Sequence, residues 1–235
     1  PACPPAATPA PTPSPTPDPE TVKQDFIDDM LSDMTVEEMA GQLFIAACRT
    51  DGAGNPVRTA SQGFASLVEQ YRLGGVILFG SNIETIDQTA ALIADLQDAS
   101  GIPLFVSVDE EGGRVSRVGA NPSMGATEFP PMADVGAAGD PALARAVGRV
   151  MGEELYALGF NMDFAPVADV YTNPENKVIG DRAFGGDPQD TGEMVAAYVE
   201  GIQSAGVAAV IKHFPGHGDT LADTHTETAG IPHDI

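Results

Sequence analysis

From Thr21 onward the chain alternates between short, continuous apolar runs and longer segments whose apolar residues recur at helical spacing. Five apolar runs predict buried strands, and they lie at residues 42–47, 74–80, 103–110, 160–170 and 206–214. Amphipathic segments at residues 61–73 and 84–100 predict helices between them. Strands of continuous apolar character, each followed by a helix, are typical of a parallel sheet that is buried on both faces.

Helix start signals support these assignments. Thr35 and Glu38 have the spacing of a capping box in front of a short helix. The pairs Asp140-Pro141 and Asp187-Pro188 each place an N-cap acceptor before a proline at the first helical position. The first of these two helices is predicted to end near Gly159.

Two α/β architectures fit this alternation, a doubly wound open sheet and a (β/α)8 barrel. A glycine-rich dinucleotide fingerprint does not follow the first strand, which disfavours the nucleotide-binding version of the open sheet. Polar clusters follow the third, fourth and fifth strands, with the sequences DEEGGRVSR, ADV and KHFPGHGD. In a barrel, several strand ends contribute to one site. The sequence therefore predicts a TIM-type (β/α)8 barrel, of which about the first five strand–helix units are present.

The first twenty residues differ in composition from the rest of the chain. Residues 1–20 are rich in Pro, Ala and Thr and are predicted to form a disordered linker, which leaves residues 21–235 as an incomplete barrel domain. Such spacers often hold an exported domain away from a surface, so an extracellular or cell-surface location is expected. Cys3 is a candidate for a lipid anchor, although a plain linker is favoured. Cys48, in an apolar run, is predicted to be a small core residue and not a disulfide partner of Cys3.

Charge narrows the choice of partners. The chain has 34 acidic and 11 basic side chains and a net charge of −23. This charge repels phosphate backbones and anionic lipid heads, so we expect no nucleic-acid binding. The sequence has no uninterrupted apolar run near the length of a membrane span, so we expect no membrane insertion. The sequence does not indicate the oligomeric state.

The segment from Lys212 to His225 holds three of the four histidines. Lys212 and His213 directly follow a strand and are predicted to point into the barrel mouth, where an unpaired ammonium group would be costly. Asp223 and His225 are two residues apart, so the carboxylate could fix the imidazole tautomer and leave the other ring nitrogen as a proton shuttle. A solvated histidine is the alternative interpretation.

Two further clusters add polar side chains to the strand ends. Asp109 is predicted to accept hydrogen bonds from sugar hydroxyl groups. The alternative is that Asp109, Glu110 and Glu111 form a solvated acidic turn. Arg182 lies on a glycine-rich loop, where its guanidinium could bind a neutral polar group or a carboxylate, or simply face solvent. Four of the eleven basic residues lie in strand-end segments, namely Arg114, Arg117, Arg182 and Lys212.

A zinc-dependent barrel hydrolase is the competing interpretation. Residues of ligand type are His213, His217, Asp219, Asp223, His225 and His233. The first strand, however, lacks the His-x-His that many barrel metallohydrolases carry, and the charge of Lys212 would compete with a cation. We therefore expect no metal at the site.

The segments DEEGGRVSR, FAPVADV, VIGDRAFGGDP and KHFPGHGDTLADTH together resemble glycoside hydrolase family 3, in its β-N-acetylglucosaminidase branch. The resemblance runs from about Thr21 to the end of the chain. It implies an exo-acting retaining glycosidase that removes terminal β-linked N-acetylglucosamine from cell-wall or chitin oligosaccharides. It implies no metal or organic cofactor.

The resemblance also implies roles for individual residues. The sugar hydroxyls and the N-acetyl group would be bound by Asp109, Arg117, Arg182, Lys212 and His213. His225 would be the general acid/base, paired with Asp223, in place of the usual carboxylic acid of a retaining glycosidase. Family members carry the Asp nucleophile on a later strand, so it is expected beyond Ile235. Asp169 is then interpreted as a hydrogen-bonding residue, and a non-catalytic truncated relative is a further alternative.

Overall fold

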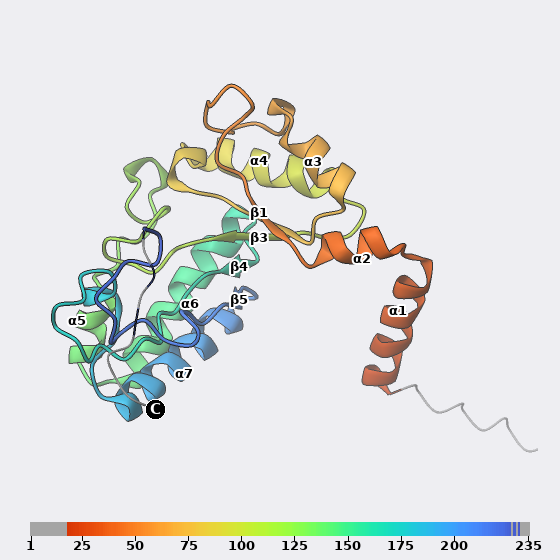
Figure 1. Ribbon diagram of the computed structural model, residues 1–235. Helices are drawn as coiled ribbons and strands as arrows, with labels where there is room; N and C mark the ends of the chain where they lie inside the picture. Colours follow the sequence, from red (N-terminus) through yellow and green to blue (C-terminus); the bar gives the residue numbers. More distant parts are fainter. Residues whose placement is uncertain (1–17, 227, 229, 231–235) are drawn as a thin grey trace, which may run out of the picture.

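The computed structural model describes residues 18–226, 228 and 230. A five-stranded parallel sheet lies at its centre, with the strands in chain order (Figure 1). The strands are β1 (Ile45–Ala47), β2 (Gly75–Ile77), β3 (Phe105–Val108), β4 (Met162–Asp163) and β5 (Ala208–Ala209). Each strand falls inside one of the five predicted apolar runs, so the prediction of five strands is confirmed.

Seven helices are formed by the described residues, together with four short 3₁₀ turns. The helices are α1 (Pro19–Asp33), α2 (Val36–Gln42), α3 (Phe64–Tyr71), α4 (Ile86–Asp98), α5 (Met132–Ala137), α6 (Pro141–Leu158) and α7 (Pro188–Ser204). The turns are η1 (Ala60–Gln62), η2 (Gly80–Asn82), η3 (Pro122–Met124) and η4 (Gly180–Arg182). The predicted start signals are present: Thr35 and Glu38 form the capping box of α2, and Asp140 and Asp187 cap α6 and α7. The helices α1 and α5 were not predicted.

Strand order decides between the two architectures left open by the sequence. A doubly wound sheet needs a point at which the strand order reverses, so that helices cover both faces. Here the order is β1-β2-β3-β4-β5 without reversal, and α2 packs on α3, α3 on α4, α4 on α6 and α6 on α7. One continuous row of helices on one side of a sequential parallel sheet is part of a TIM-type barrel.

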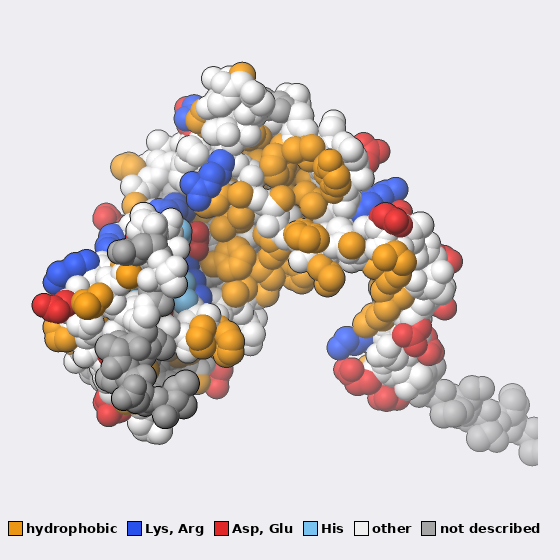
Figure 2. All heavy atoms as spheres, viewed as in Figure 1, with side chains coloured by type: hydrophobic (Ala, Val, Ile, Leu, Met, Phe, Trp, Pro, Cys, Tyr) orange, Lys and Arg blue, Asp and Glu red, His pale blue; other side chains and the backbone are white. Residues whose placement is uncertain are grey.

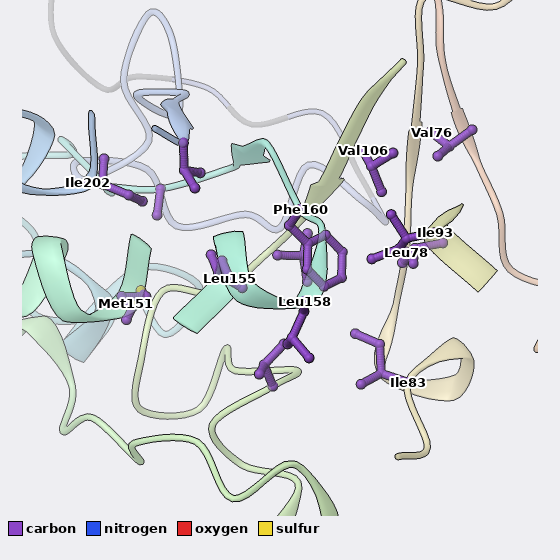
Figure 3. Close-up of a cluster of buried hydrophobic side chains, with 14 of the residues drawn as sticks. Val76, Leu78, Ile83, Ile93, Val106, Met151, Leu155, Leu158, Phe160 and Ile202 are labelled. Carbon is purple, nitrogen blue, oxygen red and sulfur yellow. The ribbon is translucent and has the colours of Figure 1, made fainter. Parts of the chain in front are cut away.

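The core lies between the sheet and this row of helices. Figure 3 shows Val76, Leu78 and Val106 from the strand segments gathered with Ile93 of α4 and Leu155 of α6, and all five are buried. Cys48 belongs to the same core with no exposed surface, and burial raises the pKa of its thiol to about 12. The predicted core role of this cysteine is confirmed. Cys3 lies outside the described residues.

Glycines allow α6 and α7 to approach closely. A Cβ atom placed on Gly201 would lie 2.2 Å from the carbonyl oxygen of Arg145, and one placed on Gly148 would lie 2.4 Å from that of Tyr198. Real Cβ atoms do not approach backbone this closely, so any side chain would force the two helices apart. This tight pair flanks β4 in the sequence, and the segment between β4 and α7 carries Asp169 and Arg182.

The opposite face of the sheet is apolar and open. Ile45, Gly75 and Phe105 are register partners and therefore point to the same side, away from Val106 and the helices. Their face continues into Leu43 and Phe44, which are 85% and 64% exposed. We call this surface the concave apolar face. The helices α1 and α2 together form an arm beside it, and Figure 2 shows the hydrophobic side chains of the face between the sheet and this α1–α2 arm. A cavity of about 640 Å³ lies along the arm, lined by residues of α1 and α2, by Met34 and Leu43, which follow these helices, and by Ile102.

The helix α1 begins two residues inside the predicted linker, at Pro19, and none of its residues is buried. The remainder of that predicted linker, residues 1–17, lies outside the described part of the chain. None of the helices in the described residues has the length and apolar character needed to cross a membrane.

The helix pair can be tested with two glycines of α7. We expect Gly201→Ala to lower the free energy of unfolding by roughly 1–3 kcal/mol, because the new methyl group collides with the backbone of α6. Gly192→Ala is the matched control: it meets nothing within 4 Å and should raise stability by up to about 1 kcal/mol through helix propensity. Urea unfolding followed by circular dichroism measures both. Equal effects would contradict the close approach of α6 and α7.

Candidate active site

The segments that follow the strands meet at one edge of the sheet around a cavity of about 470 Å³. Six of the seven predicted site residues line it, namely Asp109, Arg117, Arg182, Lys212, His213 and His225. The lining is completed by Arg49, Ile77, Phe79, Glu111, Val115 and Phe164. Side chains more than 100 positions apart in the chain are therefore brought together, as expected for the carboxyl edge of a parallel barrel. Arg114 is not part of the lining and instead pairs with Asp181.

The carboxylate of Glu111 forms ion pairs with two positively charged side chains of the site, those of Arg182 and Lys212. The guanidinium of Arg182 donates to both of its oxygens, with Nε–Oε2 and Nη2–Oε1 distances of 2.7 and 2.8 Å. Lys212 forms an ion pair with the same Oε1 and donates to Asp109 Oδ1 at 2.7 Å. Glu111 is 3% exposed, so its charge depends on these partners. Lys212 was predicted to need a polar partner, and it has two, the carboxylates of Asp109 and Glu111.

The tautomer of His213 follows from its two neighbours. Arg182 Nη2 lies 3.2 Å from His213 Nε2, and a guanidinium nitrogen can only donate, so Nε2 accepts. The proton then resides on Nδ1, which donates to Asp169 Oδ2 at 2.6 Å. Burial alone would raise the pKa of Asp169, but hydrogen bonds from the His213 ring and the His217 backbone lower it below its ordinary value. Asp169 is therefore a hydrogen-bonding residue in this structure, as interpreted from the sequence.

The segment after Asp109 is not a solvated acidic turn, which was the alternative interpretation. The side chains of Glu110 and Glu111 are both buried. Glu110 accepts hydrogen bonds from the Ser116 hydroxyl and from the backbone N–H groups of residues 117–119, and so it fastens the loop that carries Arg117. The sharp turn after Glu111 uses Gly112 and Gly113 with φ of 83° and 55°. Sequence reasoning did not identify either glutamate as a buried anchor, because an acidic pair before two glycines has the same pattern in a buried turn as in a solvated one. The side chain of Arg182 is only 12% exposed and is paired with Glu111, which excludes the surface alternative for that residue.

Asp163 lies beneath this loop, at the end of β4. Its Oδ1 accepts the backbone N–H of Glu110 at 2.9 Å, and its Oδ2 has no hydrogen-bond partner among the described residues. Burial raises its pKa well above the ordinary range of an aspartate. The side chain is completely buried and does not line the cavity, so it supports the site from within the sheet.

The loop after β5 is anchored before it reaches the predicted acid/base. A Cβ atom on Gly218 would lie 1.9 Å from the carbonyl oxygen of Val170, so this loop packs directly on the loop after β4. The buried ring of His217 bonds through Nδ1 to the Thr220 hydroxyl, and its backbone N–H donates to Asp169. His217 is thus a structural residue that positions the loop.

The Asp223–His225 pair lies beyond this anchor, at the rim of the cavity. His225 Nδ1 is 2.8 Å from Asp223 Oδ1, and the two side chains are 87% and 43% exposed. The backbone N–H and the ring of His225 both hydrogen-bond to Asp223 and lower the pKa of its carboxyl group. The carboxylate can therefore orient the imidazole and leave its Nε2 directed elsewhere.

Metal ligation was the competing hypothesis for these histidines. Among the residues that the structure describes, there is no cluster of three or more His, Cys, Asp or Glu side chains that could hold a metal ion. His213 and His217 use their ring nitrogens in hydrogen bonds within the protein. His233 lies outside the described residues.

Comparison with known proteins identifies the family. A model described as "Glycosyl hydrolase family 3 N terminal domain" matches residues 35–235. The chain belongs to glycosyl hydrolase family 3. The match begins at Thr35, the N-cap of α2, and so covers all five strands of the described sheet.

Relatives narrow the position within family 3. A beta-hexosaminidase of Nitrosomonas eutropha is 44% identical over 163 residues, which are 67% of this chain and 45% of the relative. The solved structure of a family 3 beta-N-acetylglucosaminidase from Paenibacillus is 41% identical, with a TM-score of 0.73, over 82% of this chain and 35% of that one. NagZ from Neisseria gonorrhoeae, solved with N-trifluoroacetyl-D-glucosamine, is 32% identical, with a TM-score of 0.64, over 79% and 52%. The chain thus spans about half or less of the length of these relatives.

The role of Glu111 can be tested by Glu111→Gln. An amide offers only one acceptor and turns a donor toward Arg182 or Lys212, so we expect the free energy of unfolding to fall by roughly 3–5 kcal/mol. We also expect His213 to lose its fixed tautomer, which ¹⁵N-detected NMR of the imidazole would report. The control Asp181→Asn removes an exposed pair with Arg114 and should cost no more than about 1 kcal/mol. An unchanged His213 spectrum would contradict the proposed chain of contacts.

A second test concerns the pH dependence that Asp163 confers. Because folding raises the pKa of this carboxyl group, its unfolded form releases the proton first, and stability falls as the pH rises from about 4 toward the folded pKa. Asp163→Asn is neutral at every pH. We expect wild type and variant to be equally stable below pH about 4, and the variant to gain about 1.4 kcal/mol per pH unit above it until the folded pKa is reached. Urea titrations from pH 4 to pH 8 measure this, and parallel curves would exclude the assignment.

Proposed function

We propose that this chain carries the sugar-binding and acid/base parts of an exo-acting, retaining β-N-acetylglucosaminidase. The observation that carries the proposal is the connected set of contacts Asp109–Lys212–Glu111–Arg182–His213–Asp169 in a cavity that the Asp223–His225 pair borders. The beta-hexosaminidase and beta-N-acetylglucosaminidase relatives support the same substrate class.

The network suits a neutral sugar. Asp109 offers free carboxylate lone pairs as acceptors, and the ammonium of Lys212 beside it offers a donor, so adjacent hydroxyls of one ring can be bound together. Arg117 and Arg182 offer donors to the carbonyl oxygen of the N-acetyl group. Because Asp109, Lys212 and Arg182 are held by contacts within the protein before substrate arrives, these three side chains need little reorganisation on binding.

His225 is assigned as the general acid/base. With Nδ1 directed to Asp223, its Nε2 is free to protonate the glycosidic oxygen as the bond breaks and then to accept a proton from the attacking water. The carboxylate of Asp223 stabilises the imidazolium that exists before the first step and forms again in the second. The pair thus takes the part that a carboxylic acid has in other retaining glycosidases.

The carboxylate nucleophile is proposed to lie outside the described residues. Retaining chemistry needs a second carboxylate about 5 Å from the acid/base group. Asp109 and Glu111 are engaged by Lys212, and Asp169 by His213, so none of the three is available to attack. Cell-wall or chitin oligosaccharides are the proposed substrates, and the Pro/Ala/Thr-rich segment supports an extracellular or cell-surface location.

The test is His225→Ala in a protein that extends through the whole family 3 catalytic domain. We expect hydrolysis of chitobiose to fall about 10²–10⁴-fold, whereas hydrolysis of 4-nitrophenyl N-acetyl-β-glucosaminide, whose leaving group needs little protonation, falls much less. Asp223→Asn should lower the rate of hydrolysis less than His225→Ala does, and it should again impair chitobiose hydrolysis more than hydrolysis of the nitrophenyl glycoside. Equal losses on both substrates would remove His225 from this role. Wild type that cleaves neither substrate would refute the proposed function.

A further inference from the structure

The acid/base pair lies in a turn that the pair itself organises. The carboxylate of Asp223 accepts hydrogen bonds from the backbone N–H of His225 at 2.9 Å and from its ring Nδ1 at 2.8 Å. The carbonyl oxygen of Asp223 accepts from the backbone N–H and the hydroxyl of Thr226, at 3.0 and 3.1 Å. These contacts fix Asp223 and His225 relative to each other, but they do not fix the turn relative to the cavity.

Thr224, between the two members of the pair, contacts a residue outside the turn. Its hydroxyl oxygen lies 3.5 Å from Nε2 of the buried His217 ring. The Thr220 hydroxyl donates to the carbonyl oxygen of His217 at 3.1 Å and therefore accepts from Nδ1, which leaves Nε2 to accept from Thr224. Among the described residues, this is the only hydrogen bond between residues 221–226 and the rest of the chain.

His217 is itself fixed through both of its backbone groups. Its N–H donates to Oδ1 of Asp169, and its carbonyl oxygen accepts from the fully buried amide of Asn176 at 2.6 Å. The other oxygen of Asp169 accepts from His213, one of the residues assigned to the sugar, at 2.6 Å. One carboxylate therefore places both histidines, so the ring that Thr224 contacts has a defined position relative to the sugar-binding residues.

We propose that Thr224 and His217 are positioning residues for the acid/base, and that their contact sets where Nε2 of His225 lies relative to the glycosidic oxygen. This inference rests on the proposed function. Neither side chain lines the cavity, so both act through His225. A contact of 3.5 Å is long and adds little to stability. Proton transfer, however, needs heavy atoms about 2.6–3.2 Å apart, and a displacement of about 1 Å can cost about 10²-fold in rate.

The test is Thr224→Val, which removes the hydroxyl of an exposed side chain and keeps its shape. In a protein that extends through the whole family 3 catalytic domain, we expect kcat for chitobiose to fall roughly tenfold at unchanged KM, because its leaving group needs the proton. Hydrolysis of 4-nitrophenyl N-acetyl-β-glucosaminide should stay near the wild-type rate. Thr224→Ser keeps the hydroxyl and should restore kcat. The control Thr172→Val removes a shorter hydrogen bond, to Asp219, that does not reach the turn, and it should preserve the ratio of the two rates.

Amide hydrogen exchange of the 235-residue chain, followed by NMR, tests the same contact without substrate. Thr224→Val should speed exchange at the His225 N–H roughly 2–10-fold and leave the His217 N–H unchanged, because only the turn is released. Unchanged exchange at His225, equal losses on both substrates, or faster exchange with wild-type kinetics each overturn this inference and leave the proposed function standing. A wild type that cleaves neither substrate refutes the proposed function, and the inference fails with it.

Discussion

The order of the site depends on one buried carboxylate. Glu111 is placed by the turn after β3 and holds a guanidinium from η4 and an ammonium from the end of β5. Two cations in such a position would be costly without it, because buried charge must be paired. Through Arg182 the same carboxylate reaches His213, and through Lys212 it reaches Asp109. The end of β3, η4 and the end of β5 are therefore joined by electrostatics, although β3 and β5 are not neighbours in the sheet.

Local patterns were sufficient to predict most of the scaffold. Continuous apolar runs predicted the five strands, and the Asp-Pro pairs before α6 and α7 located helix starts, because N-caps and proline at the first helical position act within a few residues. Placing polar clusters after strands predicted which residues would meet, since parallel strands end at one edge. The helix α5 escaped this reasoning because it has only six residues and lies within a long loop.

Contacts between distant segments could not be predicted in the same way. The burial of Glu110 and Glu111 depends on loops that fold over them, and nothing in an acidic turn distinguishes a buried carboxylate from a solvated one. The contact between Arg49 and Phe79 joins residues that follow two different strands. The sequence around either residue does not indicate that the other is its partner. Strand order was also open, because a sequential sheet and a doubly wound sheet share the same alternation of elements. Tertiary packing decides these features.

The concave apolar face has a consequence for how this chain behaves in solution. Two opposing forces act between copies: the net charge of −23 keeps them apart, and the exposed side chains of β1, β3 and the α1–α2 arm draw them together. Added salt weakens the first force by screening, and sulfate also strengthens the second by its exclusion from protein surfaces. Cooling weakens the apolar attraction. Dispersed chains are therefore favoured by cold, dilute buffer, and modest ammonium sulfate should bring them out of solution.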